Sequence, residues 1–327
     1  MTILNRRILL AACAVGSMLM SLPALAQDKT KLRFSAIFSD RDIRAEMMET
    51  FKKAVADDFE VETFYNGSLF KQGTELVALQ RNNLEMGNIA PQDIANQIPE
   101  WSILTSAYLF RDADHLKTFF DSEVGDEMKQ MVEDRLQVKI LGPTYFGARQ
   151  VGLVGDKTIE TPQDMAGINL RMPGGDSWQF LGQAIGANPT PMAYAEVYTG
   201  LQTGAIDGQD NPLPNVQNMK FYEVMKQIVL TSHLVGYDVL TISLEAWNKL
   251  SPEQQQAVQT AADNAIAWSA EQHVQQEADL VAYFEEQGLD VYEPNLDAFR
   301  EHAQKTYLES PLAQSWPEGM VERINAL

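Results

Sequence analysis

The chain is poor in the residues that most often build reactive centres. Its 327 residues include one cysteine, Cys13, and four histidines. Because Cys13 lies near the N-terminus, the rest of the chain offers no disulfide, thiol nucleophile or thiolate metal ligand. The histidines are scattered, and none forms the i, i+4 pair that places two imidazoles on one helical face. They are His115, His233, His273 and His302. We therefore expect neither a metal nor a cofactor.

Motifs of nucleophilic and nucleotide chemistry are also missing. The segment Gly175–Gln179 begins like the nucleophile elbow of hydrolases, but Gln179 stands where the second glycine belongs. The sequence has no Gly-rich phosphate loop and no G-x-G-x-x-G motif. The segment Asp112–His115 could hold a metal, but it fits better as a helix N-terminus, where acids favour the helix dipole. We therefore expect that the protein is not an enzyme; an exported lyase or hydrolase with an acidic cleft is the rival hypothesis.

Positive charge is scarce. Lysine and arginine total 25 residues against 45 aspartates and glutamates, which gives a net charge of −20. A chain this acidic is not expected to bind nucleic acid or an anionic lipid surface. If it binds a small anion, it must do so in a locally positive pocket, because its overall field repels negative charge.

Long apolar runs are confined to the N-terminus. Arg6 and Arg7 precede the apolar run Ile8–Leu22, and Ala24–Ala26 has the small-x-small pattern of a cleavage site. This pattern predicts a signal peptide of 26 residues, export to the periplasm and a mature chain of 301 residues (327 − 26). A lipoprotein box at Leu10–Cys13 is the weaker alternative, since cleavage there would leave an apolar stretch on the mature protein. No later run approaches the ~20 apolar residues of a membrane span.

The mature chain contains an alternation of strand and helix patterns. Short apolar or alternating runs predict strands, and runs with apolar residues three to four apart predict helices. Strands are expected at Leu32–Phe38, Phe59–Tyr65, Met86–Ala90, Lys139–Leu141 and Val239–Ser243. Helices are expected from Asp40 or Asp42 to Lys53 and over Thr74–Asn83, Ser177–Ile185 and Tyr194–Thr203. The alternation predicts an α/β fold of open sheets flanked by helices.

A long helix is predicted near the C-terminus. Ser251–Gln254 is a capping box with proline at the first helical position, and helical composition continues to Gln287, before Gly288. At 1.5 Å per residue this helix would be roughly 50 Å long, which is longer than one small lobe. The chain is long enough for two lobes and has no linker, so we expect the helix and several hinge strands to cross between them. Lobe I is expected to hold residues 27–146 and about 237–279, and lobe II residues 147–236 and about 280–327.

Arg171 is the most informative charged residue. It lies between Leu170 and Met172 in a short apolar run that predicts a strand. A guanidinium in such a run either faces solvent or points into a cleft, where its planar fork fits a carboxylate through two parallel hydrogen bonds. Arg149 and Asn211 could lie nearby, and an asparagine amide both donates and accepts. The second orientation of Arg171 would make the protein a receptor for small organic acids.

Several short motifs follow one another along the chain. They are Tyr65–Leu69, Thr161–Gly167, Leu170–Pro173, Pro189–Met192, Glu196–Tyr198, Leu201–Gln209 and Leu250–Glu253. With these motifs, the sequence from Lys31 to about Phe284 resembles the periplasmic solute-binding proteins of tripartite ATP-independent periplasmic (TRAP) transporters, the DctP-type family. The resemblance implies a two-lobe periplasmic binding protein that closes about a hinge on a small organic acid and hands it to a membrane permease.

The resemblance also implies a set of ligand-binding residues. Arg171 matches the carboxylate clamp of the family, and Arg149 matches its second cleft arginine. The asparagine after the D-G-Q turn matches Asn211, and the aromatic residue after P-M-A matches Tyr194. The early cleft loop, the loop after Tyr65–Leu69 and the return to the first lobe add Ser39, Asp40, Arg41, Gln72 and Tyr237, and the expected set also includes Trp178 and Asp210.

The identity of the acid stays open at this point. Sialic-acid-binding relatives place an amide three residues after the clamp arginine, where this chain has Gly174, which argues against sialic acid. If Arg41 faces the cleft, three guanidiniums would favour a doubly charged acid or a sulfonate; alternatively, Arg41 pairs with Asp40 or Asp42 at the surface. Sugar acids, C4-dicarboxylates, 2-oxoacids, aromatic acids, ectoines and sulfonates are all compatible with the sequence. A receptor that presents its ligand to a sensor kinase is the alternative to transport.

Overall fold

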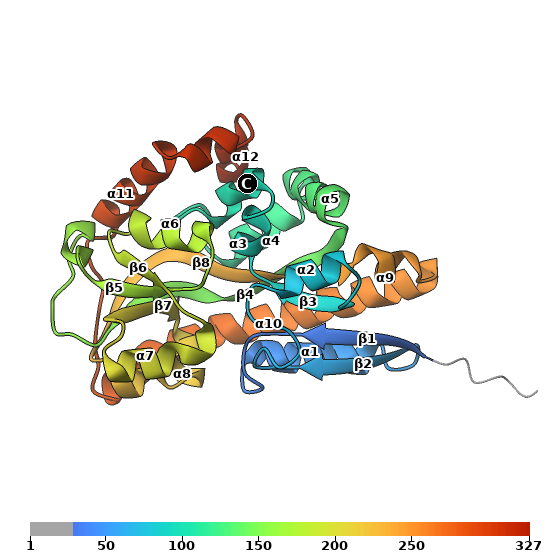
Figure 1. Ribbon diagram of the computed structural model, residues 1–327, viewed down its shortest axis with the longest axis horizontal. Coiled ribbons are helices and arrows are strands. Elements are labelled where there is room, and N and C mark those ends of the chain that lie inside the picture. Colours follow the sequence, from blue (N-terminus) through green and yellow to red (C-terminus); the bar gives the residue numbers. More distant parts are fainter. Residues whose placement is uncertain (1–28) are drawn as a thin grey trace, which may run out of the picture.

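The computed structural model describes residues 29–327 and shows one mixed sheet with helices on both faces (Figure 1). The predicted signal peptide, with Cys13, lies outside the described residues. The strand order is β2-β1-β3-β8-β4-β7-β5-β6, and β9 pairs with β8. The strands are β1 (Thr30–Ser35), β2 (Phe59–Phe64), β3 (Met86–Ile89), β4 (Val138–Leu153), β5 (Asn169–Met172), β6 (Asn188–Pro191), β7 (Gly208–Pro212), β8 (Gln227–Ser243) and β9 (Asp290–Tyr292). The predicted α/β fold is confirmed.

The structure has both the helices that the sequence pattern predicted and several that it did not predict. They are α1 (Ile43–Ala54), α2 (Glu75–Gln80), α3 (Pro91–Ala95), α4 (Ala113–Phe120), α5 (Glu123–Leu136), α6 (Asp176–Ala184), α7 (Val197–Thr203), α8 (Leu213–Asn218), α9 (Leu244–Asn248), α10 (Pro252–Glu286), α11 (Leu296–Leu308) and α12 (Met320–Asn325). Asp42 caps α1 by accepting a hydrogen bond from the backbone N–H of Arg44, and Ser251 and Gln254 form the predicted capping box of α10. Asp112 caps α4, so this segment is a helix start, as the sequence favoured.

Two long antiparallel strands form the centre of the sheet. β4 and β8 have 16 and 17 residues and pair with each other along most of their length. The sequence predicted only their ends, Lys139–Leu141 and Val239–Ser243. The pairing shifts register at several places, one of them between Tyr145 and Gly147. Each bulge changes which side chains face a given side of the sheet, so the period-two pattern breaks and the interior of each strand escapes prediction.

β4 and β8 join two halves of the sheet. One half contains β1, β2 and β3, and the other contains β5, β6 and β7. Gly147 in the bulge of β4 pairs with Gly236 of β8 between these halves. Gly147 has a φ of +110°, and a Cβ there would lie 2.8 Å from Pro212 and 2.9 Å from Glu277 of α10, so this position requires glycine. We propose that the boundary between lobe I (with β1–β3) and lobe II (with β5–β7) lies at this crossing, near residues 146 and 236.

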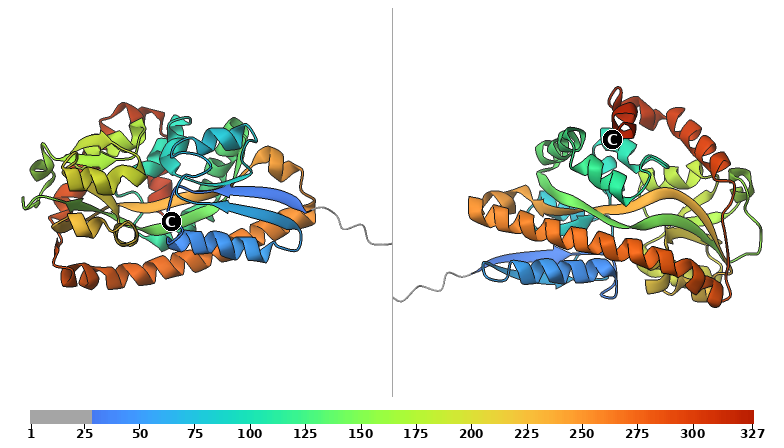
Figure 2. Two further views of the ribbon diagram at one scale, coloured as in Figure 1. Left: turned by 60° about the horizontal axis from the view of Figure 1, so that its bottom comes forward. Right: turned by 180° about the vertical axis from the view of Figure 1, so that it is seen from behind.

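Helix α10 runs along both halves. Its 35 residues correspond to roughly 50 Å at 1.5 Å per residue. In the right panel of Figure 2 it crosses the molecule, and it packs against α1 and β4 and also against α8 and β9. This confirms the predicted long helix, which ends one residue before Gln287. Among residues 29–327, no helix combines the length and the apolar character needed to cross a bilayer.

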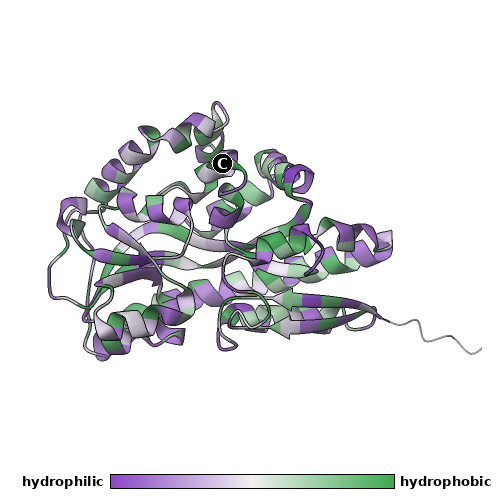
Figure 3. Ribbon diagram, in the orientation of Figure 1, coloured by the Kyte–Doolittle hydropathy of each residue, from purple (hydrophilic) through white to green (hydrophobic). Residues whose placement is uncertain are grey.

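The C-terminal segment departs from the predicted lobe division. The sequence assigned residues 280–327 to lobe II, and α11 does pack there through Phe299 and Tyr307. Helix α12, in contrast, places Met320 and Ile324 in the apolar core of α4 and α5 in lobe I. Figure 3 shows hydrophilic residues beside hydrophobic ones on the surface helices. Such an amphipathic pattern shows that a helix covers a core but does not say which core.

Candidate functional site

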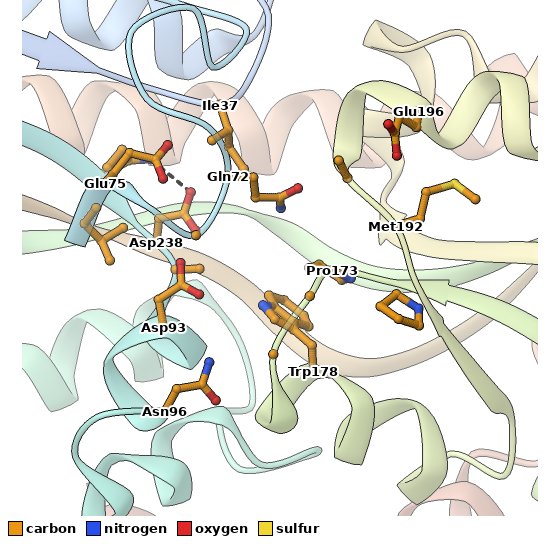
Figure 4. Close-up of a pocket in the computed structure, with 18 residues that line it drawn as sticks. Ile37, Gln72, Glu75, Asp93, Asn96, Pro173, Trp178, Met192, Glu196 and Asp238 are labelled. Atoms are coloured by element: carbon orange, nitrogen blue, oxygen red, sulfur yellow. Dashed lines mark hydrogen bonds between the residues drawn. The ribbon is translucent and has the colours of Figure 1, made fainter. Parts of the chain in front are cut away.

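A cleft with polar and apolar side chains lies between the two proposed lobes. Its main cavity has a volume of about 460 Å³ and is lined by residues of both lobes (Figure 4). A smaller cavity of about 50 Å³ is lined by Arg171 and Arg149, and we call it the arginine end of the cleft. Gln72, Pro173 and Trp178 line both cavities, so the two form one continuous cleft.

Strand β5 places Arg171 at the arginine end. The residue is 1% exposed, and its Nε donates a hydrogen bond to the carbonyl of Met192 at 2.9 Å. Its Nη2 is buried and has no hydrogen-bond partner among residues 29–327. Burial lowers the pKa of Arg171 to about 10, while Asp210 acts to raise it and Arg149 to lower it. A buried charge with an unsatisfied donor is unfavourable on its own, so this geometry suits an anion that accepts from Nη2.

Arg149 lies next to Arg171 but has a counter-charge. Its Nε donates to Oδ2 of Asp210 at 2.7 Å, and its Nη2 donates to Oδ1 at 2.9 Å. Asp210 also lies 3.1 Å from Nε2 of His233. Burial alone would raise the pKa of Asp210, but the Arg149 guanidinium outweighs it and holds that pKa well below its usual range. The guanidinium of Arg149 lies 4.7 Å from the ring centre of Trp178, so it is positioned by an ion pair and an aromatic face.

Tyr194 and Asn211 complete the arginine end. The guanidinium carbon of Arg171 lies 5.8 Å from the ring centre of Tyr194. Nδ2 of Asn211 donates to Oε1 of Gln209 at 2.6 Å, and Oδ1 of Asn211 lies 3.5 Å from Nη2 of Arg149. These contacts fix the amide orientation of Asn211. The structure thus brings together the arginines, the asparagine and the tyrosine that the sequence motifs singled out.

The lobes touch across the cleft at two places. Oε1 of Gln72 accepts a hydrogen bond from the backbone N–H of Tyr194 at 2.9 Å. Oδ1 of Asn96 lies 3.3 Å from Oγ of Ser177 at the start of α6. Gly175, which precedes α6, has a φ of +104°, and a Cβ there would lie 2.6 Å from Nδ2 of Asn96. A glycine at this position therefore permits the close approach of the two lobes.

The early loop contributes different residues from those expected. Asp40 and Arg41 are exposed, Ser39 is half-buried, and none of the three lines the cleft. Ile37 and Phe38 line it instead. The expected cleft residues were a few positions too far along the chain. Because β1 ends at Ser35, the chain passes the cleft earlier and then turns outward to reach the cap of α1. Arg41 thus lies at the surface and adds no guanidinium to the cleft, but Asp42 pairs with Arg44 rather than with Arg41.

Tyr237 and Asp210 also differ from the expected roles. Tyr237 is buried, its hydroxyl donates to the carbonyl of Leu104 at 3.0 Å, and its ring packs against Phe110 and Phe120. It is a core residue on the lobe I side of β8 that lines neither of the two cavities above, although it lines a small adjoining cavity with Arg149 and Trp178. Asp210 is fully buried and does not line the cleft either, because its carboxylate is turned toward Arg149. Asp210 therefore acts on the cleft through Arg149.

Arg44 is a cleft residue that the sequence reasoning missed. Its Nε and Nη2 donate to the two carboxylate oxygens of Asp42 at 3.0 and 2.8 Å, and its Nη1 donates to Oδ2 of Asp238 at 2.8 Å. Its guanidinium lies over the rings of Phe38 and Phe146 at 4.3 and 4.0 Å. A signal was available, since a helix N-terminus disfavours cations and an arginine two residues after the cap needs carboxylate partners.

Three acidic residues on the lobe I side were missed as well. Glu75, Asp93 and Asp238 line the larger cavity, which we call the acidic end of the cleft, and Asp238 also lines the arginine end. Burial is the main cause that raises their pKa values, to about 8 for Glu75, about 7 for Asp93 and about 6 for Asp238. Glu75 and Asp93 lie in the first turns of α2 and α3, where acids are common because they favour the helix dipole, so their sequence context does not indicate a shared site.

The chain matches a family model over residues 34–312, most of its length. That family is the bacterial extracellular solute-binding proteins, family 7, named DctP. The chain belongs to the DctP family. The predicted resemblance is therefore confirmed, and the protein is a solute-binding protein rather than an enzyme.

Two named DctP relatives bind acidic sugars, whereas a third, from Shewanella loihica, is a C4-dicarboxylate-binding periplasmic protein. The sialic acid-binding periplasmic protein SiaP of Vibrio cholerae is 34% identical over 212 residues, which cover 65% of this chain and 65% of that protein. The 2,3-diketo-L-gulonate-binding periplasmic protein YiaO of Escherichia coli is 29% identical over 234 residues, 72% of this chain and 71% of that protein. Both are similar to this chain over most of the described lobes.

Solved structures of DctP proteins share the fold over nearly the whole described chain. A TRAP periplasmic solute-binding protein from Roseobacter denitrificans with bound 3-deoxy-D-manno-oct-2-ulosonic acid (KDO) is 48% identical, with a TM-score of 0.90, and the match covers 91% of this chain and 99% of that one. A second protein from Roseobacter denitrificans, with bound L-galactonate, is 26% identical, with a TM-score of 0.81 and coverage of 91% and 98%.

Proposed function

We propose that this DctP protein is exported to the periplasm, captures a sugar acid in the cleft between its lobes and delivers it to a TRAP membrane permease. The observation that carries the proposal is Arg171, whose buried Nη2 has no acceptor among residues 29–327 although the side chain lines the cleft. A carboxylate at the arginine end would accept from Arg171 and lie beside Asn211 and Tyr194. Arg149, already held by Asp210, would add a second positive group at a fixed position.

A sugar acid fits the cleft better than the other acids that the sequence allowed. Arg149 and Arg44 are both paired with carboxylates, so Arg171 alone brings a cation without its own counter-charge. This supports a ligand with one negative charge over a dicarboxylate. The larger cavity is lined by apolar side chains, among them Trp178, and by carboxyl and amide groups, which suit the hydroxyls of a sugar.

KDO is the first ligand to test. The Roseobacter denitrificans protein with bound KDO is 48% identical to this chain, and other DctP structures carry L-galactonate or β-D-galacturonate. Sialic acid is the ligand named for the Vibrio cholerae relative. Gly174 lines the cavity with open space around its Cα, so the amide expected of sialic-acid binders is not supplied there.

Hinge closure is the proposed mechanism of capture. A ligand that touches both lobes stabilises the closed state through the contacts that only this state makes. The contacts of Gln72 with Tyr194 and of Asn96 with Ser177 are of this kind, because each joins lobe I to lobe II. The bulge at Gly147 is the proposed hinge in β4. Micromolar affinity needs about −8 kcal/mol, which one desolvated ion pair and several hydrogen bonds can supply.

A ligand screen tests the proposed function. The purified protein is screened by thermal shift with KDO, galactonate, galacturonate, glucuronate, sialic acid, a C4-dicarboxylate, an ectoine and a short sulfonate, and hits are measured by calorimetry. We expect a monocarboxylic sugar acid to give the largest stabilisation and to be recovered unchanged after incubation. Preferential binding of the dicarboxylate or the sulfonate would contradict the proposal. Co-purification with a permease rather than with a sensor kinase separates transport from signalling.

A further inference from the structure

The acidic end of the cleft is not needed to hold a carboxylate. Figure 4 shows Glu75, Asp238 and Asp93 one below another on the lobe I side of the cavity, with Met192 and Glu196 on the opposite side. Three carboxyl groups on one wall of an anion-binding cleft oppose the binding of a negatively charged group. Their position therefore favours a ligand whose nearby part is neutral and donates hydrogen bonds.

Several oxygens of these carboxyl groups are free to accept. Glu75 is 3% exposed, and its Oε1 is buried without a hydrogen-bond partner among residues 29–327. Asp238 uses Oδ2 to accept from Nη1 of Arg44 at 2.8 Å and from Nδ2 of Asn88 at 3.0 Å, which leaves Oδ1. A buried acceptor without a donor is unfavourable, so Glu75 favours a ligand that brings one.

The cation that pairs with this wall is shared with another carboxylate. Arg44 contacts Asp238, but it also forms a bidentate ion pair with Asp42, so one guanidinium serves two carboxyl groups. The charged groups that act on Glu75 are Asp93 and Asp238, and the one that acts on Asp93 is Asp238. A second carboxylate on the ligand would be one more negative charge in this group, whereas hydroxyls donate to carboxyl oxygens without adding charge.

We propose that Glu75, Asp93 and Asp238 form a specificity site that accepts hydrogen bonds from the hydroxyl groups of the ligand and rejects a terminal second carboxylate. The inference rests on the proposed capture of a sugar acid and narrows the ligand class to sugar acids with a single carboxylate. The arginine end binds one carboxylate, and the acidic end accepts hydrogen bonds from the hydroxyl groups of the rest of the ligand. The protein thus discriminates a sugar monoacid from the diacid that has the same carbon chain and the same hydroxyls.

The test compares two ligands that differ only at the far end. Galactonate ends in a hydroxymethyl group and galactarate ends in a second carboxylate. Calorimetry at pH 9, above the pKa values of about 8 for Glu75 and about 7 for Asp93, measures both ligands, together with KDO, on the wild-type protein and on the double variant Glu75→Gln, Asp93→Asn. We expect galactarate to bind the wild type at least about tenfold more weakly than the tightest monoacid, because like charges repel in the cleft. In the double variant we expect galactarate to bind about tenfold more tightly than in the wild type, since amide groups replace the negative charges.

A second variant tests the hydrogen bonds themselves. Glu75→Ala, Asp93→Ala removes the acceptors, and we expect the affinity for the tightest monoacid to fall about tenfold. Glu301→Gln, at an exposed position on α11, is the control for a loss of negative charge, and we expect it to leave the affinities for both ligands unchanged. Asp238 is left intact because it also pairs with Arg44.

The outcomes separate the two proposals. A wild-type protein that binds no sugar monoacid contradicts the proposed function and the specificity site together. A protein that binds a monoacid but binds galactarate within about threefold of it overturns the specificity site alone. A double amide variant that still binds the monoacid, and is therefore folded, but whose galactarate affinity does not rise overturns it as well.

Discussion

Two buried arginines line the cleft from opposite lobes, and their surroundings differ. Arg44 of lobe I donates to the carboxylates of Asp42 and Asp238, whereas Arg171 of lobe II donates from Nε to one backbone carbonyl. Burial acts to lower both pKa values, but the carboxylates raise that of Arg44, while that of Arg171 falls to about 10. Burial of a charge therefore does not identify a ligand-binding residue. The lack of a counter-charge does, because only an uncompensated guanidinium gains a counter-charge when an anion arrives.

Arg149 lies between these two cases. It is paired with Asp210, like Arg44, yet it lines the arginine end beside Arg171 and is held against Trp178. Its pairing with a fully buried carboxylate fixes its orientation before any ligand binds. A charged group held in this way adds positive potential without having to be reoriented, which is the advantage of preorganisation.

The largest effect is expected from Arg44→Met. The change leaves Asp42 and Asp238 buried without their cation, and breaking a buried pair from one side destabilises a protein by about 3–5 kcal/mol. The free energy of unfolding without ligand, from denaturant titration, checks this. Arg171→Met is the matched control, because the same substitution at the unpaired arginine should leave that free energy unchanged or raise it. Equal destabilisation by both variants would contradict the view that Arg44 stabilises the fold whereas Arg171 binds the ligand.

Arg171→Met should act on binding instead of on stability. It removes the guanidinium fork that faces the ligand carboxylate, and we expect a loss of about 100-fold, or ~3 kcal/mol, in affinity for the sugar acid. Arg171→Lys should lose at least about tenfold, because an ammonium cannot form the two parallel bonds. Calorimetry measures both, with the exposed Arg81→Met as control. Near-native binding by the methionine variant is incompatible with the carboxylate clamp.

The buried carboxyl groups also differ in whether they have a counter-charge, and this difference can be tested through the pH dependence of stability. Glu75 is buried without a cation, and burial raises its pKa to about 8. The folded state therefore binds its proton more tightly than the unfolded state, where the pKa is about 4.3. Stability is full below that unfolded value and falls as pH rises toward about 8.

Glu75→Gln removes this pH dependence at one position. We expect the loss of stability between pH 5 and 9 to shrink by on the order of 2 kcal/mol in the variant, measured by denaturant titration of the protein without ligand. Glu301→Gln should leave the profile of the wild type in place. An unchanged profile in Glu75→Gln would mean that Glu75 is ionised at neutral pH and paired with a cation.

The smallest effect is expected where the lobes meet. Gln72→Ala removes the acceptor of the Tyr194 backbone N–H, and a neutral hydrogen bond is worth about 1 kcal/mol, so affinity should fall by roughly fivefold. The loss should appear mainly in a faster dissociation rate, because the contact exists only when the lobes approach each other. Surface plasmon resonance or stopped-flow fluorescence resolves the two rates, with the exposed Gln130→Ala as control. A change confined to the association rate would argue against a closing contact.

Local patterns in the sequence predicted much of the fold. The caps at Asp42, Asp112 and Ser251 depend on side chains within a few residues, and the structure has each of them. The long strands β4 and β8 were underestimated because bulges interrupt the alternation on which a strand prediction depends. The position of α12 was missed because an amphipathic helix does not specify its partner.

The site shows the same division. Family motifs led to Arg171, Arg149, Asn211, Tyr194 and Gln72, all of which line the arginine end. They did not lead to the acidic end, because Glu75, Asp93 and Asp238 come from three separate elements and none belongs to a motif.

The sequence by itself determined the family, the α/β class, the scarcity of reactive residues and the presence of Arg171 in an apolar strand. Only the tertiary structure decided which of the arginines has no counter-charge. Asp238 is 194 residues from Arg44 and Asp210 is 61 residues from Arg149. Whether a charge is compensated depends on partners that the fold brings within 3 Å. The residues next to an arginine in the sequence do not indicate which distant residues these partners are.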